Sequence, residues 1–316
     1  LFLKKNKDKK DFYFNIFGDQ NKINNELDKN KTNRENIKIF HTTSVVSDEE
    51  SPLKAIKSSK NSSMWNAVNS QLNLGSDITV SAGNTGVLFV ISKMILKNID
   101  KISRPALAAL WPNKKGSNVV LDLGANIECD ENNLVEFAEM GSALYKSLFI
   151  NEVPKVALLN IGSEEIKGTD TIKKAYNILN EISQRGDFQF NGYIEGNKIP
   201  EGDSNVIVTD GFTGNIALKT AEGTANFIVN EFKQSMTSNI IGKFSSLINI
   251  KNLNKVKKKL DPRLYNGAIL IGLNSPVVKS HGSTDYIGFS HSLNVCIKIV
   301  KNNLIQKIKD NILDEN

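Results

Sequence analysis

Cysteine is scarce in this sequence, and long apolar runs are absent from it. Its two cysteines, Cys129 and Cys296, cannot build a disulfide framework, and their spacing matches no common metal site. No window approaches the roughly 20 consecutive apolar residues of a membrane-spanning helix, and no signal-peptide pattern is present. These absences predict a protein of the reducing cytoplasm with no resident metal.

Two familiar nucleotide-binding fingerprints are missing as well. Residues 162–169 contain spaced glycines, but they end in Lys-Gly-Thr, whereas a phosphate loop needs Gly-Lys followed by Ser or Thr. The segment 81–86 (SAGNTG) does not fit the G-x-G-x-x-G pattern of dinucleotide sites. The sequence therefore offers no positive case for an ATPase or a Rossmann dehydrogenase, and we expect no cofactor.

Positive charge is in moderate excess, with 40 Lys and Arg against 34 Asp and Glu and a net charge of +6. Much of it lies in two lysine clusters, at residues 4–10 and 251–259. Solvated lysine faces explain most such clusters, and the alternative is attraction to an acidic partner or an anionic membrane. No nucleic-acid-binding motif accompanies the lysines and aromatics do not interleave with them, so nucleic acid is not an expected partner.

Four apolar runs each lead into a glycine-containing turn. They are continuous rather than alternating, as in a parallel sheet that helices cover on both faces. These runs predict strands at 77–80, 118–123, 155–161 and 205–209. Further strands are expected at 12–17, 37–40, 267–272 and 277–279, and helices at 87–96, at 169–181, from 215 to about 233 and from 283 onward. The length and the 40% hydrophobic content allow a sizeable core, and we predict one α/β domain over residues 1–316.

An asparagine accompanies each of the four turns: Asn84, Asn126, Asn160 and Asn215. Ligands of open α/β sheets bind at the carboxyl ends of the strands, so we expect the turns to share one pocket. An amide can donate to an oxyanion without adding a proton equilibrium, and free N–H groups at a helix start suit an anion. The alternative is that these side chains cap helices and satisfy turns. Both roles can hold together.

Lys167 lies in the turn after the third run, between two glutamates and a glycine. Most loop lysines are simply solvated, but its place beside the expected pocket makes Lys167 the best candidate to face phosphate or a developing oxyanion. His281, at the end of the last expected strand, is a further candidate to line this pocket. No Ser-His-Asp or Cys-His arrangement can be assembled, and the acidic neighbours of Cys129 disfavour a thiolate.

Residues 234–260 interrupt the strand and helix rhythm with an apolar side followed by lysines. This pattern predicts an amphipathic segment. Such a segment usually packs against its own core or a dimer partner, and docking on a membrane surface is the alternative.

Seven segments occur in the order found in one enzyme family. They are SAGNTG (81–86), SRPALA (103–108), LDLGAN (121–126), MGSA (140–143), LLNIGSEEIKG (158–168), TDGFTGN (209–215) and HGSTD (281–285). Together they closely resemble the bacterial phosphate acyltransferases of phospholipid synthesis, from about residue 12 to residue 300. The first strand of that family and its glycine- and aspartate-rich loop are not found here, so we expect an N-terminal truncation that removes part of the pocket.

The resemblance implies a three-layer α/β/α sandwich with a mostly parallel, Rossmann-like sheet, similar to the isocitrate and isopropylmalate dehydrogenase fold. It also implies a cytoplasmic homodimer in peripheral contact with the membrane through an amphipathic helical projection, which would fall in residues 234–260. The implied reaction moves a fatty acyl group from acyl-carrier protein to inorganic phosphate, and a glycerol-3-phosphate acyltransferase then uses the acyl phosphate. Lys167 and Asn215 match the lysine and asparagine implicated in catalysis. The predicted substrate- or phosphate-binding residues are Gly83, Asn84, Thr85, Gly86, Asn126, Asn160, Gly214 and His281.

This chemistry suits the residues present. Phosphate is already anionic at neutral pH, so its attack on a thioester needs positioning and oxyanion stabilisation rather than a triad or a metal. Three alternatives remain open: a phosphotransacetylase-like enzyme that uses coenzyme A thioesters, a hydride-transferring dehydrogenase, and a non-catalytic carrier-protein or membrane scaffold.

Overall fold

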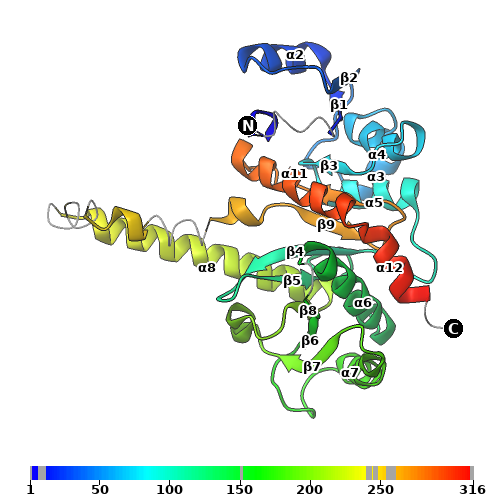
Figure 1. The fold of residues 1–316 in the computed structure, drawn as a ribbon, viewed down its shortest axis with the longest axis vertical. Helices are drawn as coiled ribbons and strands as arrows, with labels where there is room; N and C mark the ends of the chain where they lie inside the picture. Colours follow the sequence, from blue (N-terminus) through cyan, green and yellow to red (C-terminus); the bar gives the residue numbers. More distant parts are fainter. Residues whose placement is uncertain are drawn as a thin grey trace.

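The computed structural model describes residues 2–5, 12–149, 152–239, 244, 248–253 and 261–313. Its centre is an eight-stranded sheet with the order β3-β10-β9-β4-β5-β8-β6-β7 (Figure 1). The strands in this order are β3 (Thr79–Ser81), β10 (Val277–Lys279), β9 (Ala268–Ile271), β4 (Ala106–Pro112), β5 (Ser117–Leu121), β8 (Val206–Val208), β6 (Lys155–Leu159) and β7 (Gln189–Ile194).

The sheet has two parallel parts joined by antiparallel strands. Strands β5, β8, β6 and β7 run parallel to one another, and β3 runs parallel to β10. Between these parts, β10 with β9, β9 with β4, and β4 with β5 are antiparallel pairs. The predicted α/β fold with a large, mostly parallel sheet is confirmed. Strands β4 and β7 were not predicted. Strand β4 is antiparallel to both of its neighbours, so β9 runs in the same direction as β5, and the antiparallel pairing of β9 with β10 sets β10 and β3 opposite to β5.

Successive strand residues face opposite sides of the sheet, and both sides are buried. In β5, Val119 and Leu121 belong to one apolar cluster, while Val120 between them belongs to the other. Strand β8 alternates in the same way, with Ile207 on the side of Val120. Burial on both faces explains why these strands read as continuous apolar runs.

Helices cover both faces. One face packs against α6 (Glu131–Leu148), α7 (Asp170–Ile182), α11 (Tyr286–Lys301) and α12 (Leu304–Leu313), whose buried side chains include Phe137, Leu144, Leu179, Ile299 and Ile308. The other face packs against α4 (Ser63–Asn73) and α5 (Thr85–Leu96), with Val68, Leu88 and Ile91 in the core. The result is a helix–sheet–helix arrangement of three layers (Figure 1).

Helix α6 approaches the sheet closely at Gly141. A Cβ on Gly141 would lie 2.7 Å from Cγ1 of Val206 and 2.9 Å from Cδ2 of Leu121. The glycine of the MGSA segment is therefore a packing requirement rather than part of a binding loop.

The N-terminal part forms a second sheet of two parallel strands, β1 (Phe14–Gly18) and β2 (Ile37–His41), and β1 packs on α4. Both strands were predicted, but they do not join the main sheet. The helices α1 (Phe2–Lys5) and α2 (Gln20–Lys29) complete this region. Helix α3 (Pro52–Ser58) packs instead on α5 of the main body, where Ala55 joins the core cluster of Leu88 and Ile91. Short 3₁₀ turns lie at η1 (Ser183–Arg185), η2 (Gly196–Glu201) and η3 (Pro262–Tyr265).

Helix α8 (Gly211–Thr237) starts at the sheet and projects away from the body (Figure 1). The sequence analysis placed the start of the projection at residue 234, but the projecting helix begins earlier, at Gly211. Residues 240–243, 245–247 and 254–260 of the predicted segment lie outside the described residues, as do residues 6–10 of the first lysine cluster. None of the described helices combines the length and apolarity that crossing a membrane requires.

Candidate active site at the carboxyl ends of β5, β8 and β6

Three of the predicted turns follow neighbouring parallel strands, so the structure brings them to one edge of the sheet. The turns after β5 and β8 are joined by backbone hydrogen bonds. The Asp122 N–H donates to the Thr209 carbonyl at 2.9 Å, and the Gly211 N–H donates to the Asn126 carbonyl at 2.7 Å. The loop after β6 carries Lys167 at the same edge.

Asn215 lies in the first turns of α8 with its side chain exposed. Its Cβ, Cγ and Nδ2 atoms lie 3.5 Å from the position that a Cβ on Gly124 would occupy. Within the described part of the chain, no hydrogen-bond partner holds its amide. The Asn215 side chain can therefore donate to a substrate oxygen without first breaking an internal bond.

Gly214, the residue before Asn215, is buried where α8 meets β5. A Cβ at this position would lie 1.9 Å from the Asp122 carbonyl oxygen. Gly214 thus allows the start of α8 to approach the loop after β5.

Lys167 is an exposed cation at the same edge. Its Nζ lies 2.8 Å from Oε1 of Glu164, and the two side chains are 45% and 54% exposed. The hydrogen bond that Lys167 donates to the Glu164 carboxylate, together with the negative charge of that carboxylate, raises the pKa of Lys167. Lys167 is therefore charged at neutral pH, and an anionic substrate would compete with Glu164 for it.

Asn160 holds the loop that carries Lys167. Its buried Nδ2 donates to the Gly162 carbonyl at 3.2 Å and to the Lys167 carbonyl at 3.1 Å. Gly168 has φ +96°, and a Cβ there would lie 2.5 Å from Oδ1 of Asn160. The Nδ2 group of Asn160 is thus occupied within the loop, which favours the turn-satisfying role that the sequence left open, whereas its buried Oδ1 has no hydrogen-bond partner among the described residues.

The side-chain amides of Asn126 and Asn84 are also occupied by hydrogen bonds within the protein. The Asn126 Nδ2 donates to the Pro105 carbonyl at 2.8 Å and to Oδ2 of Asp122 at 2.9 Å. Asn84 caps α5 by accepting from the Val87 N–H at 3.1 Å, while its Nδ2 donates to the carbonyls of Asp48 and Glu50 at 2.8 and 3.1 Å.

The remaining predicted residues form a second group, at the carboxyl ends of β3 and β10. The Ser280 N–H donates to the Ser81 carbonyl at 2.8 Å. This joins the loop of His281 to the segment of Gly83, Asn84, Thr85 and Gly86. His281 is exposed, and its Nδ1 lies 2.9 Å from Oγ of Ser283.

The four turns, which were predicted to share one pocket, do not all leave the sheet in the same direction. Strands β3 and β10 run opposite to β5, β8 and β6, so their carboxyl ends point to the other edge. Packing also favours glycine at positions 83 and 86. A Cβ on Gly83 would lie 2.6 Å from Cε of Met64, and a Cβ on Gly86 would lie 2.8 Å from Cγ of Pro52.

Helix α8 relates the two groups. Lys219 lies one turn beyond Asn215, about 6 Å further along the helix, and its charge acts on Lys279 at the end of β10. Burial, aided by Lys219, lowers the pKa of Lys279, whereas Asp48 opposes the shift. A half-buried lysine at the end of a strand is a residue that the sequence analysis did not single out.

Asp122 was missed as well. It is fully buried at the end of β5, and its carboxylate binds the backbone of the following turn. An acidic residue inside an apolar run just before glycine was the available signal.

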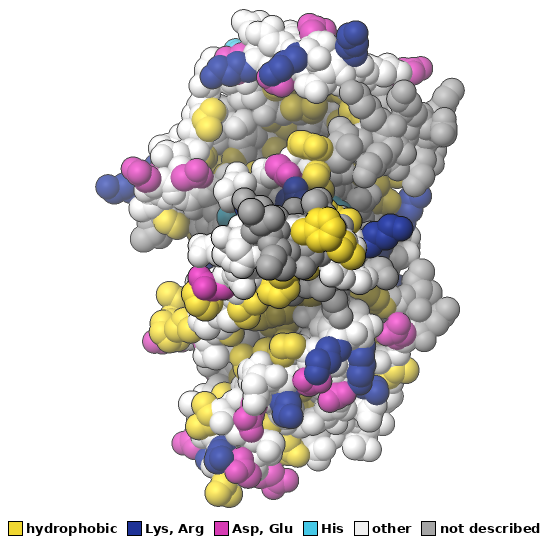
Figure 2. All heavy atoms as spheres, turned by 90° about the vertical axis from the view of Figure 1, so that its left-hand side faces the viewer, with side chains coloured by type: hydrophobic (Ala, Val, Ile, Leu, Met, Phe, Trp, Pro, Cys, Tyr) yellow, Lys and Arg dark blue, Asp and Glu magenta, His cyan; other side chains and the backbone are white. Residues whose placement is uncertain are grey.

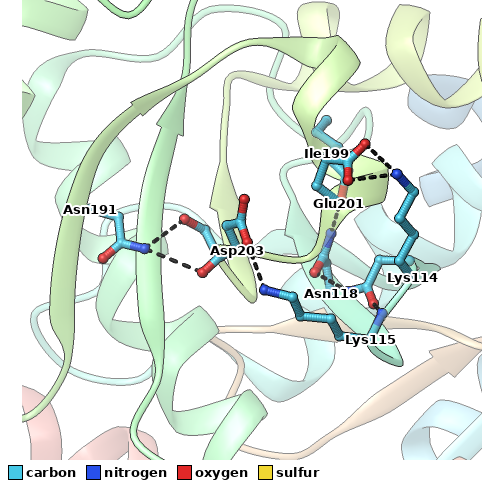
Figure 3. A network of polar contacts seen from close by, with 9 residues as sticks. Lys114, Lys115, Asn118, Asn191, Ile199, Glu201 and Asp203 are labelled. Atoms are coloured by element: carbon cyan, nitrogen blue, oxygen red, sulfur yellow. Dashed lines mark hydrogen bonds and ion pairs between the residues drawn. The ribbon is translucent and has the colours of Figure 1, made fainter.

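The amino ends of β5, β6 and β8 carry different features. A cavity of about 410 Å³ lies there, lined by residues that include Lys115, Tyr145 and Asn205 but no predicted site residue. Nearby, Lys114 pairs with Glu201 and Lys115 with Asp203, at 2.7 and 2.6 Å (Figure 3). Such exposed pairs contribute little to stability. In the described ranges, no group of three His, Cys, Asp or Glu side chains forms a metal site.

Known proteins similar to this chain share its fold and much of its sequence. A family model described as fatty acid synthesis protein matches residues 2–307. The phosphate acyltransferase of Pelagibacter ubique is 61% identical over 300 residues, covering 95% of this chain and 89% of that protein. The phosphate acyltransferase of Parvibaculum lavamentivorans is 43% identical, covering 94% and 82%.

Solved structures support the same fold. The EutD phosphotransacetylase from Staphylococcus aureus superposes with a TM-score of 0.62 at 15% identity, covering 95% of this chain and 89% of that one. A 4-hydroxythreonine-4-phosphate dehydrogenase from Klebsiella pneumoniae gives 0.52 at 11% identity, covering 90% of each chain. The chain therefore belongs to the fatty acid synthesis protein family and, within it, to the phosphate acyltransferases.

Proposed function

We propose that this protein transfers a fatty acyl group from acyl-carrier protein to inorganic phosphate, producing acyl phosphate for phospholipid synthesis. The observation that carries the proposal is the placement of Asn215 and Lys167. They follow the neighbouring parallel strands β8 and β6, so an unpartnered amide and a cation lie at one edge of the sheet.

In the proposed reaction, a phosphate oxygen attacks the thioester carbonyl carbon and forms a tetrahedral oxyanion. The C–O bond to phosphate forms, the C–S bond breaks, and the carrier leaves as a thiolate that takes a proton from water. Lys167 turns from Glu164 to the phosphate and offsets its charge. Asn215 donates from Nδ2 to the oxyanion, where a hydrogen bond gains most in the transition state.

The test measures acyl phosphate trapped as hydroxamate by hydroxylamine, with acyl-carrier protein as donor. Lys167→Ala and Asn215→Ala should each lower turnover by about 10²–10³-fold while the circular dichroism spectrum stays unchanged. Lys114→Ala is the matched control, since Lys114 is also an exposed lysine paired with a glutamate, at 2.7 Å, but lies at the other end of the strands. Near-normal turnover of Lys167→Ala would remove Lys167 from the mechanism.

A second candidate uses an acyl group carried by coenzyme A. The fold similarity to the EutD phosphotransacetylase favours it as the runner-up. Comparing acyl-coenzyme A with acyl-carrier protein at equal concentration separates the two donors. Faster turnover with coenzyme A would replace the main proposal.

The projecting helix supports the proposed homodimer and peripheral membrane contact. Phe227, Ile228 and Phe232 on α8 are 64%, 52% and 54% exposed, and apolar side chains gather at the surface where α8 faces the viewer in Figure 2. Exposed apolar groups of this kind mark interaction surfaces. Phe232→Glu should either weaken self-association, measured by analytical ultracentrifugation, or reduce membrane binding, measured by flotation with anionic vesicles. An unchanged result in both assays would exclude this surface as the site of dimer or membrane contact.

We further propose a cellular place for the enzyme and a structural relation for its sheet. The enzyme is cytoplasmic and hands its acyl phosphate to a glycerol-3-phosphate acyltransferase at the membrane. Its sheet is related to that of the isocitrate and isopropylmalate dehydrogenases, as the sequence resemblance implies.

A further inference from the structure

The carboxylate of Asp122, the first residue after β5, accepts five hydrogen bonds. Oδ1 accepts from the N–H groups of Leu107, Gly124 and Ala125 at 3.0, 3.2 and 3.0 Å. Oδ2 accepts from the N–H and the Nδ2 of Asn126 at 2.7 and 2.9 Å. A buried carboxylate is tolerated only when it is satisfied in this way, and here four of the five donors come from the turn 124–126 and its side chain.

The turn held by Asp122 supports the start of α8. The Asn126 carbonyl accepts from the Gly211 N–H at 2.7 Å, and strand-like bonds join Thr209 to Leu121 and Asp122 at 2.7 and 2.9 Å. Gly214 packs so closely on the Asp122 carbonyl that a side chain has no space. The position of the first turn of α8 therefore depends on the position of this loop.

Asn215 stands directly on the same turn. Gly124, at φ +121°, lies beneath it, with the Asn215 Cβ, Cγ and Nδ2 3.5 Å from where a glycine Cβ would be. A displacement of the turn would tilt the amide that donates to the oxyanion. Asp122 itself is 0% exposed and its oxygens are fully engaged, so it acts on the reaction only through other residues.

We propose that Asp122 is a positioning residue for Asn215: its buried carboxylate locks the turn 124–126 under the start of α8 and so fixes the direction of the Asn215 amide. This inference rests on the proposed function. A hydrogen bond that is optimal only in the transition state is sensitive to small displacements, so its misplacement lowers kcat more than it raises KM.

The central variant is Asp122→Asn, which keeps the shape of the side chain. Its new NH₂ group must face N–H donors on one side or the other, so the turn loses at least one hydrogen bond. We expect kcat to fall about 10–100-fold, while the KM values for phosphate and the acyl donor change less than threefold. Amide hydrogen exchange at residues 211–215 should increase in the same variant.

A double-mutant cycle separates positioning from general stability. In the Asn215→Ala background, where the amide is absent, Asp122→Asn should change the residual kcat less than twofold. An equal loss in both backgrounds would overturn the proposal, as would a folded Asp122→Asn protein with unchanged kcat. Normal turnover of Asn215→Ala alone would instead refute the proposed function, so the two failures are distinguishable.

Two further variants keep the test decisive. If Asp122→Asn does not fold, Asn126→Ala removes only the Nδ2 bonds to Asp122 and Pro105; its kcat should fall about 3–10-fold, again only when Asn215 is present. Asn118→Ala is the control for stability, because Asn118 is a buried amide at the other end of β5, bonded to the Ile199 carbonyl at 2.8 Å (Figure 3). Loss of kcat in Asn118→Ala equal to that in Asp122→Asn would show a merely structural effect and overturn the proposal.

Discussion

Gly214→Ala tests the contact on which the proposed site rests. The new Cβ would lie 1.9 Å from the Asp122 carbonyl oxygen and 2.8 Å from Cγ2 of Thr209. Cβ atoms do not approach carbonyl oxygens within 3.0 Å, so the start of α8 must move by about 1.1 Å. Both the carbonyl and the helix are backbone, and neither can turn aside as a side chain would.

The cost follows from what this movement disrupts. Overpacking of a tight contact costs about 1–3 kcal/mol, and weakening the bond from the Gly211 N–H to the Asn126 carbonyl adds roughly 1 kcal/mol. We therefore expect Gly214→Ala to lower the free energy of unfolding by about 2–4 kcal/mol. Turnover should also fall, because Asn215 moves with the helix.

Urea unfolding followed by circular dichroism, at one protein concentration for all variants, measures this change. Gly223→Ala is the matched control in the same helix: nothing lies within 4 Å of its added Cβ. Alanine is the better helix former, so that variant should be more stable by up to about 1 kcal/mol. If Gly214→Ala unfolds at the wild-type urea concentration with an unchanged slope, the close approach of α8 to β5 is incorrect.

Two other predictions address reactivity and the core. Burial and the negative charge of Asp122 raise the pKa of Cys129 from an ordinary 9.0 to about 11. Since only the thiolate reacts, iodoacetamide should label Cys129 about 100-fold more slowly at pH 8 than an ordinary thiol. The labelling rate should then increase about tenfold per pH unit toward pH 10. Rapid labelling at pH 8 would contradict this environment. Phe137→Ala, which empties a fully buried position of α6, should cost about 3–5 kcal/mol in urea unfolding, whereas Tyr13→Ala, at a side chain 78% exposed, should change stability little.

Local pattern predicted much of the fold. The runs at β5, β6 and β8 were recognisable because both faces of these strands are buried, so no polar residue interrupts them. Strand β7 was missed because QFNGYI mixes polar residues and a glycine at φ +76° with apolar ones. Strand β4 was missed because its alanines have little strand propensity of their own and its pairing with β5 and β9 makes it a strand.

The candidate site was only partly predictable. The sequence singled out Lys167, Gly214 and Asn215, which the structure places at one edge of the sheet. It also predicted Asn126 and Asn160 as binding residues and left a turn-satisfying role open; in the structure their Nδ2 groups donate to neighbouring carbonyls and to Asp122. Whether an asparagine faces a ligand or its own backbone depends on the path of the surrounding loop, which residue type does not reveal.

By itself, the sequence determined the local features: apolar runs that become strands, glycine turns that lead into helices, and the set of segments that marks the family. These depend on neighbours in the chain, so they can be read from it directly. Only the tertiary structure decided that β3 and β10 run opposite to β5, β6 and β8, and hence which turns meet. Strand direction depends on pairing between segments far apart, such as β4 with β9, and no local signal encodes that choice. The same long-range packing sets Asp122 and Gly124 beneath Asn215.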